Sequence, residues 1–115
     1  MDADAALAEL TELSSQVEAA VVLDEQGVAG STGTGTESLA AAADELLRAA
    51  TGVRGDGPAV TRVEVMLPEA SVFLVLEGDR RIVARAVPRP TPGLVVHDLR
   101  ACLRQLAAGE GPPDA

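Results

Sequence analysis

The stretch TGTESLAAAADELLRAA, residues 34–50, decides how the rest of the chain is expected to fold. Its apolar residues recur at spacings of three and four, so they share one face of a helix. Thr34 and Thr36 are candidate N-caps, and Gly52 follows the last apolar position, where a helix commonly ends. We therefore predict a long helix that ends near Gly52. Its core-facing residues are Leu39, Ala43, Leu46, Leu47 and Ala50.

Short apolar runs bounded by turn residues flank this helix on both sides. They predict five strands, two before the helix and three after it. The strands are expected at residues 19–23, 28–31, 61–67, 72–76 and 81–87. In residues 61–67 apolar and polar residues alternate, as in a strand with one buried face. The central helix must then carry the chain across one face of the sheet.

Helices are also predicted near both ends, over residues 2–15 and 94–107. Asp2 or Asp4 can cap the first, and Thr91 can cap the last, with Pro92 at its first position. The order α-β-β-α-β-β-β-α predicts an α+β sandwich with a five-stranded antiparallel sheet. We expect the central helix on one face of the sheet and the terminal helices on the other.

Length and composition indicate one domain, residues 1–108, followed by a disordered tail, residues 109–115, of glycine, proline and acidic residues. The formal net charge of −9 argues against binding to nucleic acid or to an anionic membrane surface. A single cysteine excludes an internal disulfide. Because no signal-like start or membrane-length apolar run is present, we expect a cytoplasmic protein without membrane insertion.

The two residues best suited to nucleophilic chemistry do not form a pair. His97 is the only histidine and Cys102 the only cysteine, and a separation of five positions puts them on different faces of a helix. Cys102 falls on the apolar stripe, where a cysteine packs as a small apolar residue. One histidine and one cysteine also cannot form a structural zinc site.

Three other candidates for chemistry have simpler interpretations. The segment GSTGTG, residues 30–35, lacks the lysine of a phosphate-binding loop and reads as a connector. The adjacent acidic pairs Asp24-Glu25 and Asp44-Glu45 are expected to be solvated. We predict no catalytic residue, no cofactor and no metal site, while a role for Arg54 as an arginine finger stays open.

Four segments resemble the Roadblock dynein light-chain family, including its bacterial MglB-like branch. They are EAAVVLDEQGVAGST (18–32), ESLAAAADELLRAA (37–50), SVFLVLEGDRRIVARAV (71–87) and PTPGLVVHDLRACLRQL (90–106). The resemblance implies a Roadblock-like sandwich that forms homodimers or heterodimers and binds Ras-like small GTPases or acts as a scaffold beside them. Some members stimulate GTP hydrolysis by the partner. The family offers no invariant catalytic residue that could be carried over to this sequence.

Two functions follow from this resemblance. The first is a non-enzymatic regulator or adaptor that homodimerises and binds a Ras-like small GTPase, with or without an effect on its GTP hydrolysis. The alternative is a structural dimerisation or scaffold module that leaves nucleotide turnover unchanged. A third class, a small-ligand sensor of the profilin or PAS type, would be marked by a stable pocket.

The strand at residues 61–67 is expected to pair on one side only, with residues 72–76, which leaves a free edge. If two copies met antiparallel near Val63, Arg62 of one copy would lie opposite Glu64 of the other, twice. The central helices would then meet over a shared sheet and form a broad face for a GTPase. The predicted dimer-interface residues are Arg62, Val63, Glu64, Met66, Leu39 and Ala43.

Overall fold

The computed structural model describes residues 2–109, and within them it has three helices and five strands in the predicted order. The elements are α1 (Ala3–Leu13), β1 (Val17–Asp24), β2 (Gly27–Thr32), α2 (Thr36–Arg54), β3 (Arg62–Met66), β4 (Ser71–Glu77), β5 (Arg80–Ala86) and α3 (Pro92–Gly109). The predicted α+β fold class is confirmed. Apart from Gly109, the predicted tail lies outside the described residues.

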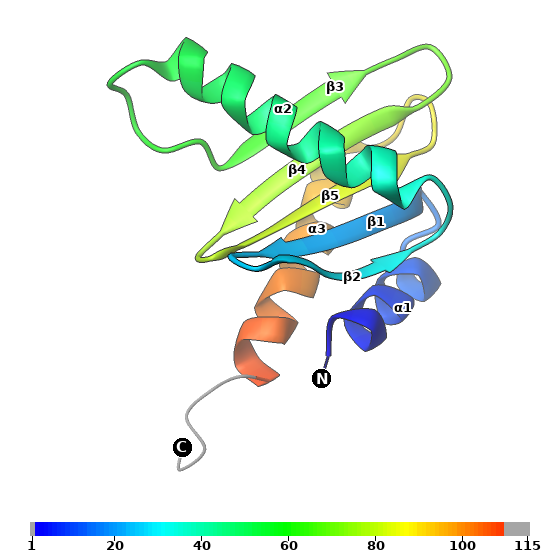
Figure 1. Ribbon diagram of the computed structural model, residues 1–115. Coiled ribbons are helices and arrows are strands. Elements are labelled where there is room, and N and C mark those ends of the chain that lie inside the picture. The colour runs from blue at the N-terminus through cyan, green and yellow to red at the C-terminus, as the bar shows by residue number, and fades with distance from the viewer. Residues whose placement is uncertain (1, 110–115) are drawn as a thin grey trace.

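The five strands form one antiparallel sheet in the order β2-β1-β5-β4-β3. β1 and β5 therefore lie inside the sheet, although more than fifty residues separate them in the chain. Helix α2 crosses one face of the sheet, and α1 and α3 lie on the opposite face (Figure 1). This three-layer arrangement is the predicted sandwich.

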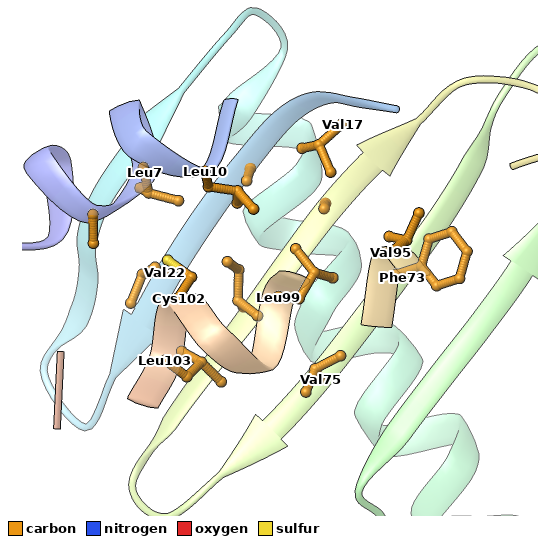
Figure 2. Packing of buried hydrophobic residues seen from close by; sticks show 14 of the residues in the cluster. Leu7, Leu10, Val17, Val22, Phe73, Val75, Val95, Leu99, Cys102 and Leu103 are labelled. Carbon is orange, nitrogen blue, oxygen red and sulfur yellow. The ribbon is translucent and has the colours of Figure 1, made fainter. Parts of the chain in front are cut away.

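The larger core lies between the sheet and the terminal helices. Leu7 and Leu10 of α1 and Leu99 of α3 form one cluster with the strand residues that point to this face, such as Val22. Phe73 of β4 lies beside Val95 of α3 in the same cluster (Figure 2). Phe73, the single aromatic residue, has no exposed surface. The remaining space is filled by aliphatic side chains, as the composition predicts.

A second core lies between the sheet and α2. Leu39 and Ala43 of the helix pack against the strand residues that point to this face, such as Val21, Leu74 and Val83. Leu46 is partly buried and packs against this core, so the prediction that it belongs to the core is confirmed only in part. Leu46 lies near Val65 of β3, where the sheet ends, and therefore has neighbours on one side only.

The boundaries of α2 differ from the prediction at both ends. Gly35, in the left-handed conformation, is the N-cap, and no side chain caps the helix. The helix continues through Gly52 to Arg54 and ends at Gly55, which has a positive φ of 58°. Arg54 itself donates a hydrogen bond to the Gly57 carbonyl, which fixes the following turn. The predicted cap of α1 is confirmed, since Asp2 Oδ1 accepts the Ala5 N–H at 2.8 Å, and α3 begins at Pro92 as predicted.

Helix α1 lies unusually close to β2 at Gly30. A Cβ atom at this glycine would lie 2.8 Å from Ala3 Cβ and 3.1 Å from the Asp4 nitrogen. Both distances are shorter than ordinary contacts, so a side chain here would push the start of α1 away from the sheet. Gly52, in the last turn of α2, has open space around the same position.

We predict that Gly30→Ala lowers the free energy of unfolding by about 1–3 kcal/mol, because the added methyl group meets the α1 backbone. The matched substitution Gly52→Ala is expected to raise it by up to about 1 kcal/mol, since alanine favours a helix and finds free space. Chemical denaturation of the two variants measures both values. Equal effects of the two substitutions would show that the approach of α1 to β2 is not tight.

We predict that Leu99→Ala costs about 2–5 kcal/mol of unfolding free energy, because Leu99 is fully buried and its loss leaves a cavity. Leu46→Ala is expected to cost less than about 2 kcal/mol in the monomer, since part of that side chain already contacts solvent. Denaturation midpoints at low protein concentration compare the two. A larger loss at Leu46 than at Leu99 would contradict the assignment of the core.

Candidate functional site

The only histidine and the only cysteine lie apart on α3. His97 is exposed, whereas Cys102 is buried and contributes to the larger core. Burial, and after it the negative charge of Glu9, raise the pKa of Cys102 to about 11. Because the thiolate is the reactive form, a thiol with this pKa is a poor nucleophile at neutral pH. Among residues 2–109 no group of three or more potential ligands is arranged to hold a metal ion.

The acidic pairs have local structural partners. Asp44 forms an ion pair with Arg81 at 3.2 Å, which ties α2 to β5. Asp24 Oδ1 accepts the Gln26 N–H at 2.8 Å and stabilises the turn between β1 and β2. No helix within residues 2–109 combines the length and the apolar character needed to cross a bilayer.

The glycine-rich segment 30–35 comprises the end of β2 and the short connection, residues 33–35, that joins β2 to α2. A Cβ at Gly33 would lie 2.6 Å from the Glu18 carbonyl oxygen, and Gly33 has a positive φ of 88°. Arg85 Nη1 donates to the Thr34 carbonyl at 3.1 Å, and Arg85 also forms an ion pair with Glu18. The glycines therefore serve the backbone path and its packing, and the loop is more constrained than the connector that the sequence predicts.

The β3 edge is the sheet edge that stays open. β3 pairs with β4 alone, as predicted, and no hydrogen bond to its outer side is present among residues 2–109. Arg62 and Glu64 face the same side as Val75 and Phe73, their partners in β4, which is the α3 side of the sheet. They form an ion pair with each other at 3.2 Å within the single chain.

The opposite edge, β2, is partly closed by the chain itself. Asp4 Oδ1 accepts the Ser31 N–H at 3.3 Å, and the start of α1 covers Gly30. A second strand could therefore not pair along β2 without displacing α1. Such closure of an edge prevents unwanted association, whereas an open edge invites pairing.

An apolar trough accompanies the β3 edge on the α2 side of the sheet. It has a volume of about 200 Å³. Its lining residues are Ala42, Glu45, Leu46, Val65 and Val72. Close to the edge, Met66 and Leu67 expose 51% and 49% of their surface. The edge and the trough together form a surface with unpaired backbone groups and incompletely buried apolar side chains.

The structure separates the six predicted interface residues into two groups. Arg62, Glu64 and Met66 are accessible on β3, and Val63 is partly buried beneath α2. Leu39 and Ala43 are enclosed within the single chain, with exposures of 6% and 0%, so they offer almost no surface to a second copy. The side of α2 that carries them is turned toward the sheet.

Ala42 and Leu46 line the trough instead, although the sequence analysis did not assign them to an interface. Leu46 belongs to the same apolar stripe as Leu39 and Ala43. The pattern alone could not show that the sheet ends beneath this part of the helix.

Neither a protein-family model nor a curated protein matches the chain. Several solved structures, however, have the same fold. A Roadblock/LC7 domain from Streptomyces avermitilis aligns with a TM-score of 0.79 and 21% identity, over 94% of this chain and 97% of that one. MglB from Myxococcus xanthus aligns with a TM-score of 0.64 and 15% identity, over 92% and 89%. MglC from the same organism aligns with a TM-score of 0.58 and 15% identity, over 90% and 98%. The predicted resemblance is confirmed at the level of structure, and the chain has the Roadblock/LC7 fold.

Proposed function

We propose that this protein is a non-enzymatic regulator or adaptor that forms a homodimer through the β3 edge and binds a Ras-like small GTPase. The observation that carries the proposal is the contrast between the two sheet edges. β2 is partly closed by α1, whereas β3 is open and lies beside an apolar trough. A partner of this class would place the function in the cytoplasm.

In the proposed dimer, two β3 strands meet antiparallel about a two-fold axis near Val63. Arg62 of each copy would then lie opposite Glu64 of the other, and the ion pair seen within one chain would become part of a four-charge cluster. Backbone hydrogen bonds would extend the sheet from one copy into the next. The charges contribute little energy because they are exposed, but they favour one register over its neighbours.

On the α2 side the same contact would cover the trough. Leu46 and Val65, incompletely buried in the single chain, would be brought against the corresponding residues of the second copy. Burial of apolar surface contributes about 25 cal/mol per Å², so this side would supply most of the stabilisation. The two α2 helices would form a joint face that one chain cannot form alone.

A small GTPase is the partner class that the Roadblock resemblance implies for such a joint face. Segment 30–35 of the chain itself does not form a phosphate-binding loop, because Gly30 lies in β2 against α1 and Gly33 packs against Glu18 and Ala19. Arg54 at the end of α2 donates to Gly57, and this bond would have to break before Arg54 could reach a bound nucleotide. We therefore propose recognition of the GTPase by shape and charge, with no residue inserted into its active site.

We predict that the protein has twice the chain mass of 11.7 kDa in solution at micromolar concentration. Glu64→Arg is expected to weaken the dimer by about 1 kcal/mol, or several-fold in Kd, because two cross-strand attractions become repulsions. Adding Arg62→Glu to this variant should restore the affinity. Light scattering over a dilution series measures these changes.

A charge control for this experiment is Glu12→Arg, which changes the net charge equally but lies on the exposed surface of α1, a helix that packs on β1 and β2 and not on the β3 edge. The control is expected to dimerise like the unmodified protein. A monomer mass at all concentrations, or equal weakening by Glu12→Arg, would disprove the proposed interface.

We predict that the isolated protein neither binds nor hydrolyses GTP, while the immobilised dimer captures a small GTPase from an extract of the source organism. Calorimetry with GTP tests the first part, and mass spectrometry of captured proteins tests the second. Glu64→Arg serves as the dimer-deficient control and should capture less. Hydrolysis assays with the purified pair then distinguish a regulator from a scaffold, and capture of no GTPase by a proven dimer would reject the partner assignment.

A further inference from the structure

A second surface lies on the opposite side of the sheet from α2, between the two terminal helices. We call it the α1/α3 groove, and its volume is about 160 Å³. It is lined by Ala6, Glu9, Leu10, Leu13, Asp98, Ala101, Cys102 and Gln105. The two helices are in contact, and the groove opens outward between them.

The floor of the groove is apolar. Leu10 and Cys102 are buried beneath it, and Ala101 lines it with only a methyl group. Leu13, the last residue of α1, also lines the groove and exposes 77% of its surface. A cavity of about 150 Å³ holds a group the size of benzene, so the groove can accept one large apolar side chain.

The rim of the groove is negatively charged. Glu9 and Asp98 come from the two different helices, and Glu9 Oε2 accepts a hydrogen bond from Gln105 Nε2 at 3.3 Å across the groove. The field of Glu9 reaches the floor, where it adds to burial in raising the pKa of Cys102. Within the described part of the chain, residues 2–109, no basic residue lines the groove.

We propose that the α1/α3 groove is a docking site for a partner segment that presents a leucine or an aromatic side chain flanked by lysine or arginine. The apolar side chain would occupy the floor beside Leu13 and Ala101. The basic residues would lie next to Glu9 and Asp98, where opposite charges favour both the encounter and the correct orientation.

Charge complementarity favours a basic partner segment over two other possible occupants of the groove, a second copy of the chain and the chain's own residues 110–115. A second copy docked about a two-fold axis through the groove would bring Glu9 and Asp98 against the same carboxylates of its partner, which repels. Residues 110–115 of the chain itself contain Glu110 and Asp114 and no basic residue, so they carry the wrong sign. A separate partner with an apolar side chain and basic flanking residues is complementary to both the apolar floor and the negatively charged rim.

The probe for this proposal is a synthetic helical peptide of leucine, lysine and alanine, with its leucines along one face. Two comparison peptides carry glutamate in place of lysine or alanine in place of leucine. Fluorescence anisotropy measures binding, and the alkylation rate of Cys102 reports whether the groove is the site. We expect the leucine–lysine peptide to bind at least about ten-fold more tightly than either comparison peptide, and to slow the alkylation of Cys102.

Two pairs of protein variants separate the groove from the general negative charge of the molecule. Asp98→Lys alters the rim, and Glu69→Lys makes the same charge change in the exposed turn between β3 and β4. Ala101→Arg fills the groove, and Ala107→Arg adds the same side chain to an exposed position of α3 outside the groove. We expect the two groove variants to weaken peptide binding by about ten-fold or more, and the two controls to bind nearly as the unmodified protein does.

Each of three results would overturn the proposal. Glu69→Lys could weaken peptide binding as much as Asp98→Lys does, the glutamate peptide could bind as tightly as the leucine–lysine peptide, or the peptide could leave the alkylation rate of Cys102 unchanged. A lower oligomer mass for Ala101→Arg would mean that a second copy fills the groove, which also overturns it. Faster alkylation after removal of residues 110–115 would assign the groove to the chain's own end, again against the proposal. Glu64→Arg, which tests the β3 dimer, is expected to leave peptide binding unchanged, so the two proposals fail independently.

Discussion

The structure depends on one constraint: the central strands must bury both of their faces at once. β1 reads VEAAVVLD, and all but its second and last residues are buried. Its neighbour β5 is paired on both sides, with β1 and with β4. Strands that are apolar on both faces need a cover on each side. Helix α2 provides one cover and the α1–α3 pair provides the other, and the order of elements along the chain follows from this requirement.

The covers are unequal, and the difference generates the two surfaces of interest. A single helix cannot cover a five-stranded sheet, so α2 leaves Val65 and Val72 incompletely covered near the β3 edge. Two helices cover the other face more fully, but helices that pack side by side leave a groove where the residues between them are small, as at Ala6 and Ala101. The two open surfaces therefore arise because helices of fixed diameter cover a sheet of fixed strand spacing incompletely.

Most of the fold could be predicted from the sequence because local patterns and the overall architecture agree. The alternation in residues 61–67, the run of apolar residues in β4 and the Pro92 start of α3 each indicated the element that forms. The end of α2 could not be predicted, because Gly52 is a plausible terminus that the helix tolerates, and Gly55 is the residue with positive φ. The partial exposure of Leu46 depends on where the sheet ends beneath α2. Helix periodicity predicts which face of the helix a residue lies on, but not the position of the sheet edge.

The candidate site was only partly predictable for a related reason. The free edge of β3 follows from strand order, and alternation put Arg62 and Glu64 on one face. The choice between an ion pair within one chain and a pair across two chains depends on side-chain geometry, and the single chain already satisfies it at 3.2 Å. The α1/α3 groove joins residues from the two ends of the chain, so no local motif could reveal it.

The charges also explain why the two surfaces suit different occupants. A contact about a two-fold axis requires a patch that complements itself. Neighbouring Arg62 and Glu64 on β3 would meet this requirement in the proposed dimer, because each would lie opposite its counter-charge in the second copy. Glu9 and Asp98 at the groove carry one sign and cannot do so. Three arginines elsewhere, Arg81, Arg85 and Arg104, form ion pairs with acidic residues of their own chain. With 18 acidic against 9 basic residues, carboxylates remain after such pairing, and a surface that gathers them attracts a molecule of positive charge.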